Sequence, residues 1–351
     1  MNKKIYFLLA ALCCAVTINA TESALPGEFS VSATKKVHFS KGNLQFNAQE
    51  GTHQCADGTT KKGTWRFAET QWECWGWYEN IQFTSSYNGW IDLFGWGTSG
   101  WNSGANAYLP YSTSSEFGDY YPGGSDSNDL TGEYANADWG VYNQIGEDAP
   151  GSWRTLTTDE WEYLLHGRTN ADILFGLGTV CGATGLIILP DNWEDPKPSG
   201  IIFKPSTQNG LEWQGNEYKN SDPKNFTHNE YNNTWPAMEA AGAVFLPAAG
   251  YRRESKVYGV YDLSYYWSST HDKGSFAWHI EFSVYRLVPQ KIFARSCGCS
   301  VRLVQDVNTE GIEEPTSDSS LKGRGKKVLR DGVLLIERGG KTYNAQGAQV
   351  K

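Results

Sequence analysis

The chain has 351 residues and a formal net charge of −9 at pH 7. Nucleic-acid affinity comes mostly from cationic contacts to phosphate, so this acidic balance argues against a nucleic-acid partner and favours solubility. The 15 Trp and 38 Gly, beside only 2 Met, indicate long irregular loops held in place by large aromatic side chains.

The N-terminus has the pattern of a secretory signal peptide over residues 1–20. Lys3 and Lys4 form the charged start, residues 5–16 form the apolar run, and the segment ending at Ala20 fits a cleavage site. The apolar run is too short to span a bilayer comfortably, and no later stretch approaches the ~20 apolar residues required. We therefore expect a secreted or cell-surface protein that does not span a membrane.

Cysteine usage agrees with an exported chain. Of the 7 cysteines, Cys13 and Cys14 lie within the predicted signal peptide. An oxidising compartment permits disulfides, and Cys55 and Cys74, which flank a turn-rich segment, are the best candidate pair. The odd number that remains after export leaves at least one free thiol, and the other connectivities stay open.

Short strands are predicted near the start of the mature chain. Residues 29–33, 36–39, 43–46 and 65–68 carry β-type patterns separated by turns or glycines. Residues 100–132 follow later, nearly free of aliphatic side chains and rich in Ser, Gly, Asn, Asp and Tyr. A loop of this length is often functional, although large aromatic residues within it could equally hold a structural loop together.

Two helices carry clear sequence signals. Thr157 and Glu160 form a capping box, the apolar residues after them recur at helical spacing, and Gly167 ends the helix. A second, short helix is expected to start near Thr234 and to stop at Gly242.

Several strands are expected in the second half. Residues 185–190 and 243–247 are apolar runs typical of strands buried on both faces. In residues 276–283, large apolar side chains alternate with small or polar ones, which predicts an apolar face turned inward and a polar face turned outward. Val301 and Leu303 alternate with polar neighbours in the same way, whereas residues 284–295 show no consistent period.

The composition changes after the last of these strands. Residues 307–324 contain almost no apolar side chain and are predicted to be a linker. Residues 325–351 contain short strand patterns with Asp331-Gly332 and Gly339-Gly340 at the turns, which predicts a small β-hairpin tail. The expected organisation is therefore a signal peptide (1–20), a main domain (21–306), a linker and this tail.

Six short segments resemble the formylglycine-generating-enzyme-like branch of the C-type lectin fold, as it occurs in exported Bacteroidetes proteins. They are residues 37–46, 91–97, 153–163, 245–251, 266–270 and 300–304. The resemblance implies an α+β fold, namely a C-type lectin-like fold with long irregular loops, followed by a small C-terminal β module. The tail resembles C-terminal modules of exported Bacteroidetes proteins, some of which act as secretion signals.

The closing part of the main domain also resembles the variable region of ligand-binding proteins that are diversified by retroelements. In those proteins, exposed side chains between fixed core strands bind the ligand. The resemblance implies an adhesin-like, non-catalytic protein that binds a glycan or a protein through the surface around residues 258–293. The candidate contacts are Tyr258, Tyr261, Tyr265, His271, Asp272, Lys273, His279, Glu281, Tyr285, Arg286, Gln290, Lys291 and Phe293.

An enzyme is the main alternative. Formylglycine-generating enzymes use two cysteines in copper-dependent oxidation, but the comparable stretch here, residues 245–267, has none, and Cys297 and Cys299 come later and too close together. A hydrolase needs a positioned base and nucleophile, and no motif marks an activated serine beside His271 or His279. We expect no catalysis and no cofactor.

Two further possibilities stay open. Residues 190–195 offer oxygen ligands for calcium, but a solvated acidic loop explains them equally well, and the acidic-amide pairs of sugar-binding C-type lectins are absent from the sequence, so no metal is expected. The chain could also be a structural component of a surface assembly.

Overall fold

The computed structural model describes residues 23–74, 82–196, 203–221 and 229–307, together with the strands of a small C-terminal unit. The predicted signal peptide (1–20) and residues 308–324 of the predicted linker lie outside the described residues. Two compact units make up the chain, Met1–Val307 and Asn308–Lys351. The second contains one four-stranded antiparallel sheet in the order β17 (Lys326–Arg330), β18 (Val333–Arg338), β19 (Lys341–Asn344) and β20 (Gln349–Val350).

The fold is mainly β, so the expected α+β class is wrong. Strands take up 37% of the described residues and helical segments 15%. The α-helices are single turns or little more: α1 (Trp139–Tyr142), α2 (Thr158–Glu162) and α3 (Trp235–Ala240). Both predicted helices are present, the first as α2 with the helical turn that follows it to Gly167 and the second as α3. Short 3₁₀ helices also occur, namely η2 (Phe117–Tyr120), η3 (Pro122–Gly124), η4 (Gly132–Ala137), η6 (Ala171–Ile173) and η7 (Ser206–Asn209).

The largest sheet of the main unit has five strands. Its order is β13 (Leu263–His271), β14 (Phe276–Ser283), β15 (Arg286–Ala294), β8 (Glu217–Asn220) and β7 (Leu211–Gln214). All four neighbouring pairs run antiparallel. β13, β14 and β15 follow one another in the chain, so tight turns join them into a continuous meander.

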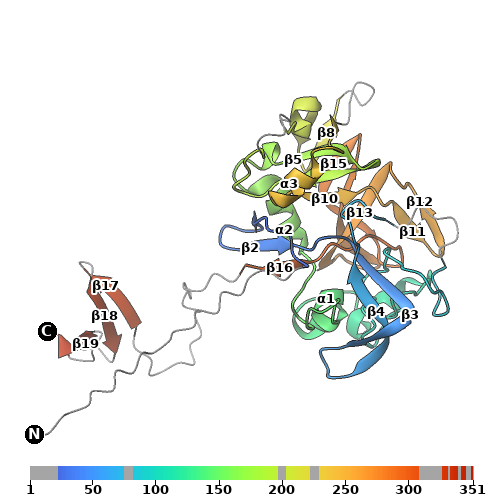
Figure 1. The fold of residues 1–351 in the computed structure, drawn as a ribbon. Helices are drawn as coiled ribbons and strands as arrows, with labels where there is room; N and C mark the ends of the chain where they lie inside the picture. Colours follow the sequence, from blue (N-terminus) through green and yellow to red (C-terminus); the bar gives the residue numbers. More distant parts are fainter. Residues whose placement is uncertain are drawn as a thin grey trace, which may run out of the picture. The chain divides into compact units, whose positions relative to one another are not determined.

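Smaller sheets surround it. A four-stranded sheet has the order β10 (Val244–Pro247), β6 (Ala183–Ile188), β5 (Phe175–Val180) and β9 (Asn229–Glu230). Two hairpins are formed by β3 (Leu44–Gln54) with β4 (Thr60–Phe67), and by β11 (Tyr251–Arg253) with β12 (Lys256–Tyr258). In Figure 1, the β3–β4 hairpin and α1 lie at one end of the main unit, and β5, β8, β10 and α3 lie at the other.

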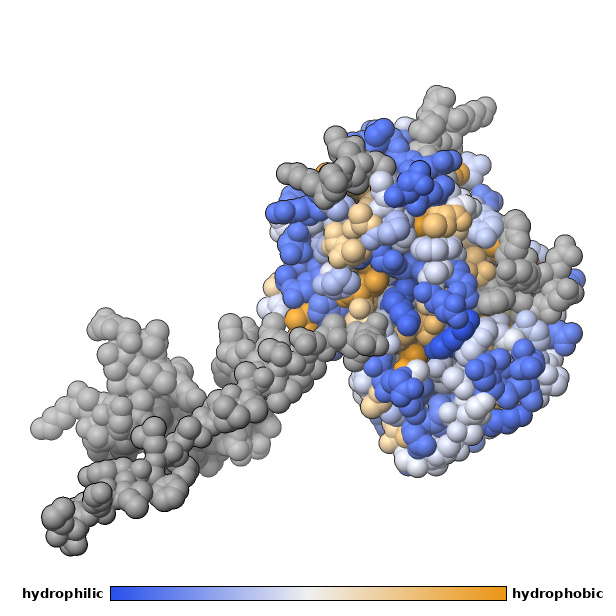
Figure 2. All heavy atoms as spheres, in the orientation of Figure 1, coloured by the Kyte–Doolittle hydropathy of each residue, from blue (hydrophilic) through white to orange (hydrophobic). Residues whose placement is uncertain are grey.

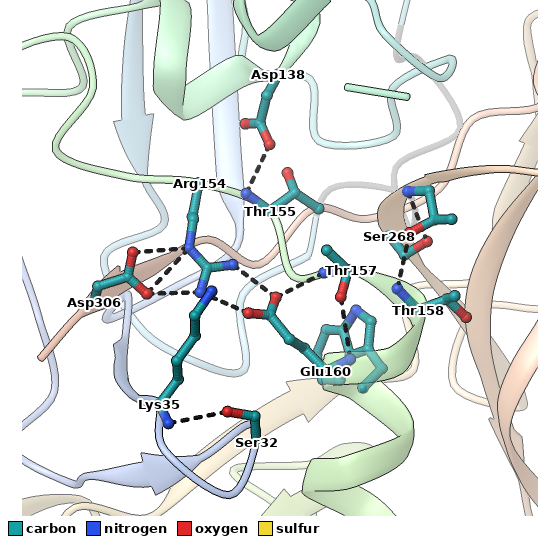
Figure 3. Close-up of polar contacts among 12 residues, drawn as sticks. Ser32, Lys35, Asp138, Arg154, Thr155, Thr157, Thr158, Glu160, Ser268 and Asp306 are labelled. Carbon is teal, nitrogen blue, oxygen red and sulfur yellow. Dashed lines mark hydrogen bonds and ion pairs between the residues drawn. The ribbon is translucent and has the colours of Figure 1, made fainter. Parts of the chain in front are cut away.

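The first and last strands of the main unit lie in one three-stranded sheet. β2 (Lys36–Phe39) is in the centre, flanked by β1 (Phe29–Ser30) and β16 (Val304–Asp306). Arg154 reinforces this closure, because its guanidinium bonds both Asp306 of β16 and Glu160 of α2 (Figure 3). The predicted capping box is confirmed: Thr157 Oγ1 accepts from the backbone N–H of Glu160, whose carboxylate accepts from the N–H of Thr157. The helix it starts continues from Tyr163 to Gly167 as a π-helical turn.

The interior is a set of aromatic-rich cores rather than one layer between helices and sheet. In one core, side chains of β2, α2, β5 and β6 pack around Trp161, which is fully buried. Ile280, Phe282 and Leu287 of the β14–β15 pair belong to the same core. A second core around Trp65, Trp96 and Trp267 supports the β3–β4 hairpin and the segments that follow it. On the face shown in Figure 2, hydrophobic residues of the described surface occur in small groups between hydrophilic ones.

Three buried arginines hold irregular segments in place. Arg252 donates to the carbonyls of Leu93 and Ser112, and Arg295 to those of Phe276 and Asp272. Arg302 likewise donates to Ser40 O at 3.3 Å. Burial lowers the pKa of Arg295 and of Arg302 to about 10, so both remain charged at neutral pH. Because a buried cation without hydrogen bonds would be costly, these carbonyls fix where the loops can run.

Most predicted strands are present, but the burial of one of them differs from expectation. The apolar runs at 185–190 and 243–247 fall in β6 and β10, which pair antiparallel and are buried over Val244–Pro247. The expected polar face at Ser300 and Arg302 is wrong, since both residues are buried. Arg302 is covered because the segments that carry its carbonyl partners, Ser40 and Phe245, pack over it.

Candidate functional site

The candidate site lies on the β14–β15 pair, whose two ends are built differently. The register runs from Phe276 opposite Ala294 to Ser283 opposite Arg286, with a β-bulge between His279 and Glu281. Eight residues of β14 span about 25 Å, so the turn after Ser283 and the turn before Phe276 are far apart. We call the first the turn end and the second the open end.

The turn end is closed by helix α2. Ile280, Phe282 and Leu287 are fully buried there in the same core as Trp161. α2 packs against β13, β14 and β15, and Gln290 Nε2 donates to Asp159 Oδ1 of the helix at 3.3 Å. The helical segment packed here, α2 with the π-helical turn that follows it, runs from Thr158 to Gly167.

At the open end the same strand face meets solvent. Phe276 and Ile292 are each 39% exposed, and Phe117 from η2 is 51% exposed. Together with Phe293 they line a hollow of about 500 Å³. Its remaining walls include Ser114, Ser115, Arg253, Glu254, Ala294, Ser296 and Cys297. Most isolated apolar side chains at a surface need no explanation, but three large ones around one hollow form a recessed apolar site.

Stacked tyrosines from β11, β12 and β13 pack against the other face of the same strands. The Tyr251 ring stacks between those of Tyr258 and Tyr265, with centroids 5.5 Å and 5.1 Å away. Phe293 meets both Tyr251 and Tyr265 edge-on. Tyr258 is 44% exposed, whereas Tyr265 is half-buried and burial raises the pKa of its hydroxyl. This stack therefore supports the rim of the hollow from behind through Phe293.

His279 lies beneath this stack and is buried, so its expected exposure is wrong. Its ring packs against Tyr265 and Phe293 at 4.8 Å and 5.5 Å between centroids. Burial lowers its pKa to about 3, although the adjacent backbone of Lys291 favours the protonated form. His279 is therefore neutral at physiological pH and acts as an aromatic core residue.

Glu281 is also buried, against expectation. It lies two residues beyond His279, and its carboxylate pairs with the Arg286 guanidinium across the β14–β15 turn. The alternation of residues 276–283 correctly groups them into two faces, but which face is covered depends on the surrounding segments. Ala277, His279 and Glu281 are covered, while Phe276 is exposed.

The predicted contact residues are spread over both ends rather than gathered at one. Three of them are exposed: Tyr258, Lys273 and Tyr285. Eight are half-buried: Tyr261, Tyr265, His271, Asp272, Arg286, Gln290, Lys291 and Phe293. Tyr285 and Arg286 belong to the turn end, and only Phe293 lines the hollow.

The expected Cys55–Cys74 disulfide is wrong. Both cysteines are buried and free. Cys55 lies at the far end of the β3–β4 hairpin beside Asn143, whereas Cys74 is packed in the second core near Asp92. Residues 55 and 74 are close in sequence, but β4 carries the chain back along the whole hairpin between them.

The residues weighed for catalysis are engaged in structural contacts. His271 Nδ1 lies 2.6 Å from Asp129 Oδ1, and its backbone N–H donates to the same carboxylate at 2.7 Å, which ties β13 to the 125–132 segment. Cys297 lines the hollow, and burial raises the pKa of its thiol, which keeps it protonated. No group of three or more potential metal-ligating side chains occurs in the described part of the chain.

The sequence reasoning missed the main wall of the hollow. Phe276 lies on the face that the strand alternation predicts to be buried, and Phe117 lies in the long loop for which the sequence leaves both a functional and a structural role open. The loop does both, because Trp101 and Tyr111 pack against the second core while Ser114 and Phe117 reach the hollow. Local sequence gives no signal for this, since the loop and the strands meet only in the folded chain.

Comparison of the chain with protein-family models, with curated proteins and with solved structures gives no match. The resemblance to formylglycine-generating-enzyme-like and retroelement-diversified proteins therefore stays a prediction from the six motifs. No helix in the described ranges has the length and apolar character needed to cross a membrane.

Proposed function

We propose that this chain is an exported, non-catalytic ligand-binding protein that recognises a glycan or a protein at the open end of the β14–β15 pair. The observation that carries the proposal is the recessed apolar site, in which Phe117, Phe276 and Ile292 stay exposed around about 500 Å³ of space. Leaving three large apolar side chains in water costs stability, so a partner that covers them is the physical reason to keep them.

The support beneath the hollow suits binding. Arg295 donates to the carbonyls of Phe276 and Asp272 and stacks over Trp96 at 4.6 Å, so the turn that presents Phe276 is held from below. Phe293 is held in the same way by the tyrosine stack. A site on strands with fixed neighbours loses little entropy when a ligand is bound.

The chemistry at the hollow favours recognition over catalysis. Its ionisable groups are Arg253, Glu254 and Cys297, and the thiol is held in its protonated form by burial. A nucleophilic thiol needs the opposite shift. Arg253 and Glu254 are exposed side chains at the rim, where charged groups steer and orient a partner.

The test is a binding screen of the full chain on arrays of glycans and of host proteins. We expect ligands whose binding is lost, by at least about tenfold, in the double variant Phe276→Ala, Ile292→Ala. Tyr285→Ala is the matched control, because it removes an exposed aromatic side chain from the turn end of the same sheet. Equal binding by the wild type and the double variant on every ligand found would overturn the proposed site.

A further inference from the structure

The outer side of strand β15 is an open sheet edge over the half that borders the hollow. β8 pairs with β15 only at Arg286 and Leu287, while β15 continues to Ala294. Within the described ranges, no strand pairs with that side of β15 beyond Leu287. An open edge presents unpaired backbone N–H and C=O groups that another extended chain can use.

The register shows which backbone groups face outward. Trp278 O accepts from Ser268 Oγ and Phe276 O accepts from Asp272 N, so both carbonyls point towards β13. In an antiparallel ladder, two residues directly opposite each other direct their backbone N–H and C=O groups either both towards the partner strand or both away from it. The residues of β15 opposite Trp278 and Phe276 therefore direct their backbone groups away from β14. The partners are Ile292 and Ala294, so the N–H groups of both and the carbonyl of Ile292 are directed to the open edge.

The hollow and the edge are adjacent. Ile292 and Ala294 both line the hollow, as do Phe117 and Phe276. In a strand added to this edge, successive side chains would point to opposite faces. One face would place an apolar side chain in the hollow, while the peptide backbone would pair with Ile292 and Ala294. Backbone pairing with a pocket for alternate side chains is the arrangement by which sheets capture extended peptides.

The charges near the edge favour a peptide of another protein over a second copy of this chain as the added strand. Lys291 lies on the edge strand itself, and Arg253 lies at the hollow together with the carboxylate of Glu254. Neither cation forms an ion pair among the described residues, so cations outnumber carboxylates here. Two copies meeting edge to edge would bring their Lys291 side chains close together, which is a known barrier to such pairing. A peptide with carboxylates beside its apolar residue would instead neutralise both cations.

We propose that the open end of β15 captures an extended peptide segment of another protein by strand addition, with one apolar side chain in the hollow and acidic residues beside it. This rests on the proposed binding function and names its ligand class. Pro289 has no N–H to donate, so pairing along this edge is confined to the residues that follow it, among them Ile292 and Ala294.

The probe is a library of fluorescent heptapeptides with a fixed central apolar residue and acidic, neutral or basic flanks, measured by fluorescence polarisation against the full chain. We expect acidic members with a central aromatic or branched residue to bind most tightly. Methylating the peptide amides that face the edge should weaken binding about tenfold for each pairing removed, whereas methylating the alternate amides should not. Absence of binding by every member, or equal binding by both methylated series, would overturn the inference.

The protein side of the test uses Ala294→Pro, which deletes one outward N–H, beside Ala294→Val, which keeps it. We expect the proline variant alone to lose about tenfold in peptide affinity. Thermal unfolding checks that it folds, and if it does not, the methylated peptides decide. If glycans or folded proteins bind in a manner that requires Phe276 while no peptide binds, the strand-addition inference is wrong and the proposed function still holds. Peptides that bind regardless of Phe276 and Ile292 would sink the proposed site.

Discussion

The two ends of the β14–β15 pair share a strand face but not an environment. Phe282 at the turn end is 1% exposed beneath α2, whereas Phe276 at the open end of the same strand is 39% exposed. The two residues have the same side chain and lie six positions apart, on the same face by strand alternation. A period of two groups residues by face, but the segments that pack over a face decide how much of it is core.

Charge differs between the ends in the same way. At the turn end, Arg286 is paired with the buried carboxylate of Glu281. At the open end, Lys291 and Arg253 have no ion-pair partner among the described residues. The charges of Arg286 and Glu281 therefore neutralise each other at the turn end, whereas the open end keeps exposed apolar surface and two cations beside the single carboxylate of Glu254.

The largest expected effect separates the two phenylalanines. Phe282→Ala should cost about 3–5 kcal/mol of unfolding free energy, because it opens a cavity in a packed core. Phe276→Ala should cost less than about 1 kcal/mol, because its ring is already in contact with water. Urea unfolding of both variants measures the difference. Equal losses would mean that the open end is packed like the turn end.

The next effect is a pH dependence of the free energy of unfolding, produced by His279, which lies between the two ends of the β14–β15 pair. Its pKa is lowered from 6.5 to about 3 in the folded chain. Between pH 6.5 and pH 3, the imidazole therefore binds a proton in the unfolded chain but not in the folded chain. Its contribution to stability is therefore fully present above about pH 6.5 and falls, by up to a few kcal/mol, as the pH drops towards 3. In His279→Phe this part of the pH dependence should be gone. Parallel stability curves for the wild type and the variant from pH 7 to pH 4 would contradict the burial of the imidazole.

A smaller loss is expected when the turn-end ion pair is broken. Arg286→Ala should destabilise the chain by about 1–2 kcal/mol, because it leaves the carboxylate of Glu281 buried without its partner. The guanidinium is partly exposed, so solvent screening keeps the loss at this modest level. The matched variant Lys291→Ala removes a cation without an acidic partner and should change stability by less than about 0.5 kcal/mol. Thermal unfolding of the two variants side by side checks the contrast.

The smallest effect belongs to the tip of the turn. Tyr285 is 59% exposed, so Tyr285→Ala should leave the free energy of unfolding within about 0.5 kcal/mol of the wild type. It should also leave ligand binding unchanged, since the turn end lies about 25 Å from the hollow. A loss of binding in this variant would move the site to the turn end.

Local structure could be predicted from the sequence where it depends on interactions between residues that are neighbours in the chain. The capping box at Thr157, the stop at Gly242 and the buried runs in β6 and β10 depend on neighbouring residues, and the structure confirms them. The fold class could not be predicted in this way, because local signals locate each helix correctly but do not give the share of the chain that forms strands, which is much the larger. Of the candidate contacts, His279 and Glu281 were misplaced because their cover comes from distant segments.

The open end itself was beyond sequence reasoning. Phe117 and Phe276 line one hollow although they are far apart in sequence, and Arg252 and Arg295 hold their segments by bonding the backbone carbonyls of Ser112 and Phe276. Buried arginines that bond carbonyls leave no periodic pattern, and Arg302 looked like a surface residue for the same reason. The missing disulfide has a related cause, since β4 separates two cysteines that are near in sequence.

The most direct test is a hydrogen-exchange footprint of the full chain with the tightest ligand from the binding screens. Recognition at the open end predicts slowed exchange at the backbone amides of residues 276–278 and 292–294, with residues 283–287 unchanged. Protection confined to residues 283–287, with the amides of Ile292 and Ala294 exchanging as fast as in the free protein, would contradict the account.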